Sequence, residues 1–423
     1  MEARTKIWCD EDEHKLFEYY VDFNEWLDSE EGATLRAANK VDGISVPSKA
    51  FYAGDKEAYD QAFREYRKDR RHEVLNERYL CDQFTDNHWF ERNLHRFDQL
   101  VDQLEAGNVV PFIGAGLSVA GGFPTWANHL SSQGRTAGID AAHTEEMLAR
   151  GEYEAVIAEI EASRGRDVFT QEIRDVFSRT GTITDATLLV TELFTDTVIT
   201  TNYDRLIEQA FDTGAKNAFQ VINGLNALAE PNTDRVSIIK LHGDIKTPGQ
   251  CVLSKNQYDY AYGNGGIDLT RTIPKLLEYY YKNSSLLFLG CSLNNDRTVH
   301  VFRAIKQGIE QKYGDIVIPQ HFAIEQAPET EQELVARNEY LLRLGITAIW
   351  FEKGQYEYVE GMLRLARNEL RYRGVMPGRS KGTIAPPRDP PKGKSGVAEQ
   401  VKVVIEHLKQ AWLSIIGRAT AMH

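Results

Sequence analysis

The sequence predicts an α/β fold built on a doubly wound, mainly parallel sheet, with a helical small lobe and a helical region at the N-terminus. Three observations lead to this fold class. Short apolar runs of strand type alternate with helical patterns from residue 109 to residue 351. The first run, 109–113, leads directly into the glycine turn Gly114-Ala-Gly116 and the start of a helix. Polar or glycine clusters follow four of the runs, as in open sheets that bind ligands at the carboxyl ends of their strands.

The N-terminal residues 1–98 are expected to form a helical region without readable chemistry of its own. Apolar side chains recur at helical spacing in three segments, which are residues 11–29, 55–80 and 86–106. Between the first two segments, glycines and a proline predict a loop over 39–54. The charged run 64–71 indicates a solvated helix face, with an anion-binding patch as the alternative.

Residues 99–373 are expected to form one domain around a Rossmann-like sheet. Its predicted strands are 109–113, 197–201, 236–241, 285–289, 321–324 and 346–351. Helices are predicted over 204–211 and 298–312. A helical block, 126–180, interrupts the sheet after its first strand and is a candidate for a small lobe that closes over a ligand.

The C-terminal part reads as a linker followed by one helix. Residues 374–396 contain five prolines and five lysines or arginines, which predicts an extended, mobile linker. In the segment 397–423, apolar residues at 4-3 spacing predict a helix over 397–416. The repeat is too short to decide between an ordinary docked helix and an oligomerisation helix.

Composition narrows the class of protein. The formal net charge of −13 argues against a nucleic-acid-binding protein as a whole. No apolar run approaches 18 residues and the N-terminus has no apolar signal-peptide core, so a soluble cytoplasmic protein without a membrane partner is expected. The cysteines form no Cys-x-x-Cys pair, which predicts neither a metal site nor a disulfide framework; they are Cys9, Cys81, Cys251 and Cys291.

The glycine turn after the first strand predicts a phosphate-binding loop. Glycine lets the backbone approach a pyrophosphate closely, and the free N–H groups of a helix start face an anion. The turn is not the dehydrogenase fingerprint, because Val119 stands where a third Gly or Ala is required and no second strand with an acidic end follows. A plain tight turn is the alternative.

Four strand-end clusters are expected to converge on one pocket, because carboxyl ends of parallel strands share an edge of the sheet. They are Gly114-Ala-Gly-Leu-Ser118, Asn202-Tyr-Asp204, His242-Gly-Asp244 and Gly290-Cys-Ser-Leu-Asn294. Taken singly, each has a structural explanation. Asn202 or Asp204 could cap a helix, His242 could end a strand without a catalytic task, and Cys291 could be a small buried residue.

The combination of motifs resembles the sirtuin superfamily, in the family's order, over about residues 99–354. The glycine loop with Gly122-Phe-Pro-Thr-Trp126 is similar to the sirtuin NAD-binding loop, in particular that of bacterial defence proteins. Thr200-Thr-Asn-Tyr-Asp204 resembles the Thr-Gln-Asn-(Ile/Val)-Asp segment. Leu241-His-Gly243 resembles the segment with the general-base histidine, and Leu289-Gly-Cys-Ser-Leu293 the later Gly-(Thr/Ser)-Ser turn.

Two departures from the family's protein deacylases argue against an acyl-lysine substrate. Those enzymes carry a zinc module of two Cys-x-x-Cys pairs, which this chain cannot build. Their Pro-Asp-Phe-Arg segment is replaced by Pro124-Thr-Trp-Ala127. The resemblance therefore implies an NAD-cleaving enzyme that depletes NAD during phage infection, with NAD as substrate and no metal.

The resemblance also implies residue roles. Asn202 would hold the ribose hydroxyl or the attacking water, and His242 would accept a proton as general base. Asp204 would fix Asn202 or nicotinamide, or offset the developing charge. The pyrophosphate would lie on the backbone of Gly114, Ala115, Gly116 and Ser118. Gly290 and Ser292 would hold the adenosine half, and the further NAD contacts are Pro124, Thr125, Trp126, Thr201 and Cys291.

Two other functions remain open from the sequence. One is a protein deacylase that works without the zinc module, and the other is a catalytically silent sensor of NAD or ADP-ribose. An NAD-cleaving enzyme must be kept off in a healthy cell, which implies a regulatory partner such as a HerA-type ATPase or a nucleotide-sensing protein, or a phage-derived trigger. Amphipathic helices outside the α/β domain predict a homo-oligomer.

Overall fold

A seven-stranded, wholly parallel sheet lies at the centre of the fold in the computed structural model, which describes residues 16–86, 88–213, 218–227, 235–313 and 318–375. The strand order is β3-β4-β2-β1-β5-β6-β7. The strands are β1 (Val109–Ile113), β2 (Thr197–Thr200), β3 (Phe219–Asn223), β4 (Val236–Lys240), β5 (Ser285–Leu289), β6 (His321–Gln326) and β7 (Ile346–Phe351).

The apolar runs form strands because both faces of the sheet are covered. In β4 and β7 every residue is buried, as expected for a parallel sheet between two helical layers. Strand β1 pairs with β2 through Phe112 and Ile199, and with β5 through Phe112 and Phe288. The chain runs outward from β1 on the β2 side and returns to its other side with β5. The loops after β1 and β5 therefore meet at the point where the winding reverses.

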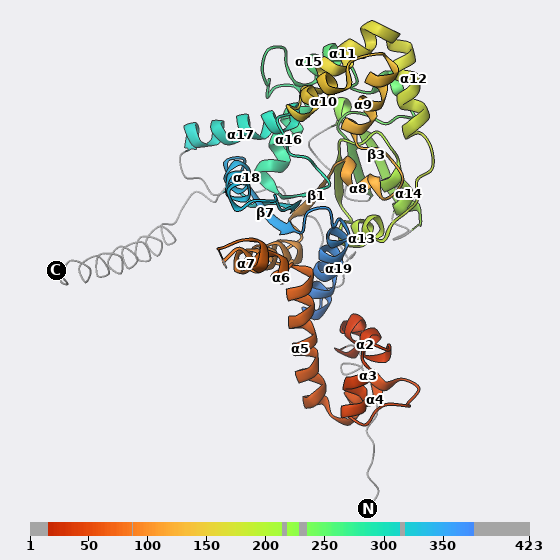
Figure 1. Cartoon of the computed structure of the whole chain (residues 1–423), viewed down its shortest axis with the longest axis vertical. Helices are drawn as coiled ribbons and strands as arrows, with labels where there is room; N and C mark the ends of the chain where they lie inside the picture. Colours follow the sequence, from red (N-terminus) through yellow and green to blue (C-terminus); the bar gives the residue numbers. More distant parts are fainter. Residues whose placement is uncertain (1–15, 87, 214–217, 228–234, 314–317, 376–423) are drawn as a thin grey trace, which may run out of the picture. The chain divides into compact units, whose positions relative to one another are not determined.

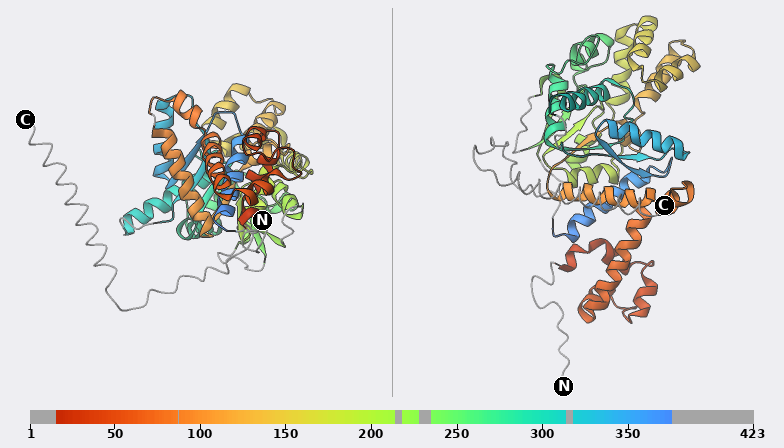
Figure 2. Two further views of the ribbon diagram at one scale, coloured as in Figure 1. Left: turned by 90° about the horizontal axis from the view of Figure 1, so that it is seen from below. Right: turned by 90° about the vertical axis from the view of Figure 1, so that its left-hand side faces the viewer.

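Helices cover the sheet on two faces (Figures 1 and 2). On one face lie α7 (His88–Glu105), α13 (Asp185–Leu193), α14 (Leu206–Thr213) and α19 (Glu357–Tyr372). On the other lie α16 (Thr272–Asn283), α17 (Arg297–Tyr313) and α18 (Glu331–Arg343). Shorter elements of the connections are α8 (Ala115–Val119), η1 (Gly224–Asn226), η2 (Pro248–Gln250) and α15 (Lys255–Tyr262).

The block after β1 is a helical lobe, as the sequence predicts (Figure 1), and it contains four helices. They are α9 (Trp126–Thr136), α10 (Ala141–Ala149), α11 (Tyr153–Arg164) and α12 (Arg166–Phe177). The lobe has its own apolar core, in which Leu130, Ile157 and Phe169 are fully buried. Thr125 and Asp140 cap α9 and α10 through their side-chain oxygens, which fixes where those helices begin.

The N-terminal region is helical, and its aromatic core is separate from that of the sheet. Its helices are α2 (Val21–Asp28), α3 (Ala33–Ala38), α4 (Pro47–Gly54), α5 (Lys56–Val74) and α6 (Glu77–Gln83). The loop prediction over 39–54 was wrong for its second half, because Pro47 occupies the first turn of α4, where a proline needs no N–H partner. The predicted helix 55–80 is broken at Asn76, which has a left-handed backbone with φ 62°.

The doubly wound parallel sheet and the helical N-terminal region are confirmed, while strand β3 was missed in the sequence. Its five residues are all half-buried, so its pattern has neither strict alternation nor a continuous apolar run. The linker over 374–396, apart from its first two residues, and the helix 397–416 lie outside the described residues. None of the helices in the described ranges is both long and apolar enough to cross a membrane.

Candidate active site

The glycine turns after β1 and β5 are in direct contact. The N–H of Gly114 donates to Leu289 O and that of Gly116 to Gly290 O, both at 2.9 Å. A Cβ at Gly114 would lie 2.5 Å from Gly290 O, and Gly290 has a left-handed φ of 65°. Glycine is therefore required here for the approach of two loops. Because two of the turn's N–H groups already have carbonyl partners, a pyrophosphate would need other donors or a shift of the loop.

Asn202 lies against the same glycine turn. Its side-chain Nδ2 donates to Gly114 O and to Ser118 Oγ, each at 3.1 Å, and the residue is only 7% exposed. The amide therefore does not cap helix α14. It joins the end of β2 to the glycine turn and the helix that follow β1, and these two hydrogen bonds orient the amide.

Asp204 performs the capping task that the sequence left open between Asn202 and Asp204. Its Oδ1 accepts the N–H of Leu206, the first residue of α14, at 3.0 Å. Burial raises the pKa of the Asp204 carboxyl, and hydrogen bonds from Leu206 and Ser118 oppose that rise. Ser118 thus contacts both Asn202 and Asp204, which makes it a support for the site.

His242 is buried in an aromatic pocket at the end of β4. Its Nε2 lies 2.7 Å from the hydroxyl oxygen of Tyr262, and the rings of Tyr203 and Tyr258 flank it. Burial lowers the pKa of His242 to about 4. The imidazole is therefore neutral near pH 7 and has a nitrogen lone pair able to accept a proton.

One cavity of about 1360 Å³ joins these elements. It is lined by all the predicted site residues except Ser118 and Pro124. Ser118 lies behind the wall, where it contacts Asn202. The lining residues predicted from sequence are Gly114, Ala115, Gly116, Thr125, Trp126, Thr201, Asn202, Asp204, His242, Gly290, Cys291 and Ser292.

The helical lobe forms a further wall of the cavity and is clamped to the α/β domain by one arginine. Residues 148–155 of the lobe line the cavity. Arg297, at the start of α17, donates to both carboxylate oxygens of Glu154 at 2.7 and 2.8 Å, and to Asp259 at 2.6 Å. The three side chains are each at most 20% exposed, so solvent screens these contacts only partly.

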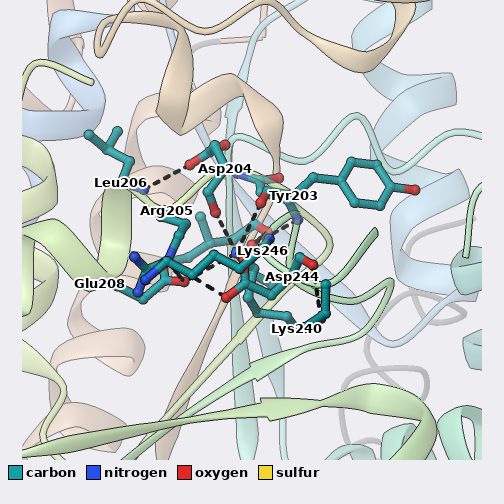
Figure 3. Close-up of polar contacts among 12 residues, drawn as sticks. Tyr203, Asp204, Arg205, Leu206, Glu208, Lys240, Asp244 and Lys246 are labelled. Atoms are coloured by element: carbon teal, nitrogen blue, oxygen red, sulfur yellow. Dashed lines mark hydrogen bonds and ion pairs between the residues drawn. The ribbon is translucent and has the colours of Figure 1, made fainter. Parts of the chain in front are cut away.

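Sequence reasoning missed two groups next to the site. Asp296 lines the cavity and accepts the N–H of Val299 at the start of α17, and burial raises its pKa to about 6. Lys240, the last residue of β4, is fully buried and contacts carboxylates and carbonyl oxygens (Figure 3). The second had a signal in the sequence: a lysine inside the apolar run 236–241, two residues before His242.

The cysteines of the described chain are separated. Cys251 is buried, Cys291 is half-buried beside the glycine turn, and Cys81 is exposed. Burial raises the pKa of the Cys251 thiol to about 12 and also raises that of Cys291. Within the described residues, no group of three or more His, Cys, Asp or Glu side chains is placed to hold a metal ion.

Comparison with known proteins relates most of the strands of the sheet to a known domain family. A family model described as SIR2-like domain matches residues 196–349, which run from β2 almost to the end of β7. This part of the chain is therefore similar to a SIR2-like domain. The match begins after the first glycine turn. That turn nevertheless belongs to the same sheet, because β1, which leads into it, lies between β2 and β5. The resemblance to the sirtuin superfamily is confirmed.

Several curated relatives match about half of this chain, and each is named NAD(+) hydrolase ThsA. The protein of Bacillus cereus (strain MSX-D12) is 30% identical over 205 residues, which cover 48% of this chain and 41% of the relative. That of Acinetobacter baumannii (strain 532279) is 27% identical, with coverage of 51% and 42%. That of Cytobacillus dafuensis is 26% identical, with coverage of 49% and 40%. The chain thus spans about two fifths of the length of the relatives it matches.

Proposed function

We propose that the protein is an NAD hydrolase that cleaves the nicotinamide–ribose bond and gives nicotinamide and ADP-ribose. One observation carries the proposal: Asn202 and His242, which lie within the match to a SIR2-like domain, line a single cavity together with the glycine turns after β1 and β5. The similarity to relatives named NAD(+) hydrolase ThsA supports it. The cavity is large enough for a dinucleotide, since ligand pockets of drug-sized molecules run to about 1,000 Å³.

The reaction consumes one water and breaks the bond between ribose C1′ and the pyridinium nitrogen. The nitrogen takes the bonding electron pair and leaves as neutral nicotinamide, while positive charge grows on the ribose. Asn202 would hold the ribose hydroxyl or the water, because an amide can donate and accept at once. His242, neutral because it is buried, would take the proton that the ribose hydroxyl or water gives up.

Support for the bound dinucleotide would come from both glycine turns. Ala115, the first residue of α8, remains a candidate for a pyrophosphate contact, with Thr125 and Trp126 on the lobe side, whereas Ser118 lies behind the cavity wall and would support Asn202 instead. Gly290, Cys291 and Ser292 would face the adenosine half. Asp204 would keep Asn202 in place through Ser118, a supporting role rather than a direct contact with nicotinamide.

The two other functions make different predictions for the same cavity. A deacylase without zinc would release nicotinamide only when an acylated peptide is supplied. A silent sensor would bind NAD and release none. His242 and Asn202 favour a catalytic site over a sensor. A neutral, buried imidazole can accept a proton, and binding of NAD alone does not require a proton acceptor.

The proposed biological role is depletion of cytoplasmic NAD in anti-phage defence, which stops the infected cell. Such an enzyme must be silent until infection. We propose that a homo-oligomer and a regulatory partner or phage-derived trigger provide the switch. In this proposal, residues 99–373 form the catalytic domain and residues 1–98 contribute contacts to the assembly. The aromatic core of the N-terminal helices packs against Tyr372 of α19, so a change of assembly there would reach the α/β domain.

The test is a nicotinamide-release assay with the full-length protein. NAD is added to purified protein and to protein in lysate from phage-infected cells, each with and without an acylated peptide. Release without peptide in either condition is expected, with equal amounts of ADP-ribose or its cyclic form. Release that depends on the peptide would establish the deacylase. Binding of NAD without release in both conditions would establish the sensor.

A further inference from the structure

Lys240 is a charged residue in a position where charges are rare. It ends β4 and is completely buried, with parallel partners on both sides: Thr200 of β2 and Asn223 of β3. Thr200 and Lys240 are the last register pair of β2 and β4, and Asn202 and His242 each follow two positions after this pair. The proposed catalytic residues thus follow the ends of neighbouring strands by the same number of positions, and Lys240 is the last residue of β4 before His242.

The ammonium of Lys240 is fully satisfied by groups on the β2 side. Its Nζ donates to Tyr203 O at 3.1 Å, to Asp204 O at 2.5 Å and to Glu208 Oε1 at 3.2 Å (Figure 3). An ammonium has three protons, and these acceptors use all of them. A carboxylate oxygen of Asp244, on the loop after His242, lies 3.7 Å away.

Two of these acceptors are backbone carbonyls of the turn that follows Asn202. Beyond Thr200 the strand pairing continues with one bond, from Leu241 N to Thr200 O at 2.8 Å, and a longer backbone bond then runs from Ile245 N to Tyr203 O at 3.4 Å. The lysine therefore crosses from the end of β4 to the turn 203–204, past the last residues of the paired strands, where it adds two hydrogen bonds to the single long backbone bond from Ile245. It ties the segment that carries Asn202 to the strand that carries His242.

The counter-charges explain why the lysine can stay buried. Glu208 is 1% exposed and Asp244 lies at the loop end, with Arg205 within 3.6 Å of both carboxylates. A buried ammonium without such partners would be strongly destabilising. A leucine or methionine would fill the same space without that requirement, so packing alone gives no reason for a lysine here.

We propose that Lys240 is a positioning residue for the proposed NAD cleavage, which fixes the Asn202 turn relative to His242 through the carbonyls of Tyr203 and Asp204. This inference rests on the proposed function for its catalytic consequence. The tether itself is a property of the fold and is measurable without turnover. A displacement of about 1 Å between catalytic groups lowers turnover by roughly 100-fold.

The experiment compares Lys240→Met/Glu208→Gln with Glu208→Gln. Removing both charges avoids an unpaired buried carboxylate, and Glu208→Gln, in which Asp244 remains as the partner of the ammonium, shows the effect of losing that carboxylate alone. Relative to Glu208→Gln, the double variant is expected to lose roughly 100-fold in kcat for nicotinamide release, with KM for NAD within about threefold. Amide exchange over residues 201–206 should accelerate about tenfold, and that of 346–351 should not change.

The outcomes separate this proposal from the proposed function. A folded double variant with the kcat of Glu208→Gln overturns the positioning role, as does unchanged exchange over 201–206. If the wild-type protein never cleaves NAD, the proposed function is overturned. The amide exchange rates over residues 201–206 then test the contact of Lys240 with the turn by themselves. Lys240→Gln/Glu208→Gln is measured beside them, so that the comparison survives if the methionine variant does not fold. Its shorter donor should give values between those of the other two.

Discussion

Replacing Asn202 by alanine separates a catalytic amide from a structural one. The change removes two hydrogen bonds of 3.1 Å, to Gly114 O and Ser118 Oγ. At about 1 kcal/mol for each, the variant should lose about 2 kcal/mol of unfolding free energy. If Asn202 also holds the ribose hydroxyl or water in the transition state, kcat should fall by roughly 100- to 1,000-fold.

Affinity for NAD should change little in this variant. An interaction made chiefly in the transition state lowers turnover rather than binding, so the Kd for NAD should stay within about threefold. Calorimetric titration with NAD gives the Kd, and a nicotinamide-release assay below the melting temperature gives kcat. Thermal unfolding gives the loss of stability, expected as a shift of roughly 4 °C.

Asn93→Ala is the matched control. Asn93 is fully buried on α7, where its side chain bonds Leu75 O at 3.0 Å and both backbone groups of Trp350, at 2.7 and 2.9 Å. It loses more hydrogen bonds than Asn202 but lies outside the cavity, so it should melt lower and keep its kcat. If Asn202→Ala behaves like Asn93→Ala, with lower stability and normal turnover, the catalytic role of Asn202 is refuted.

Four further predictions follow from the site. His242→Ala should abolish nicotinamide release and leave the fold intact; because burial holds the pKa of His242 near 4, wild-type kcat/KM should stay constant from pH 8 to about 5 and fall below that as the imidazole is protonated, so a midpoint near the ordinary 6.5 would contradict it. Chelators should not reduce turnover, and elemental analysis showing one zinc per chain would refute this. Arg297→Met should free the lobe by removing its contacts to Glu154 and Asp259, so KM for NAD should rise several-fold and proteolysis near 150–155 should quicken; unchanged values for both would refute the clamp. Light scattering should show a homo-oligomer at micromolar concentration, and a monomer both alone and with its physiological partner would count against assembly through residues 1–98.

Much of the site was predictable from the sequence because the topology of a parallel sheet brings the ends of its strands together. In a parallel sheet, carboxyl ends share an edge, so apolar runs followed by Gly114, Asn202, His242 and Gly290 were expected to meet, and these four residues line one cavity. The glycines were expected to cradle a phosphate. In the fold they allow the close approach of two loops, because a Cβ added at Gly114 would lie only 2.5 Å from Gly290 O.

Other features were decided only by contacts between residues distant in the sequence. Strand β3 forms because β4 offers a free edge with matching register, although its own pattern is weak. The clamp of Arg297 on Glu154 joins residues 143 positions apart. No local propensity encodes such a distance.

By itself, the sequence determined the periodicities and the residue types at strand ends, since these depend on neighbours along the chain. The protonation state of His242 and the role of Lys240 were left to the tertiary structure. Both depend on which groups are withdrawn from water and which partners replace it. Burial keeps the imidazole neutral, and the carbonyls of the turn after Asn202 give the buried ammonium its place.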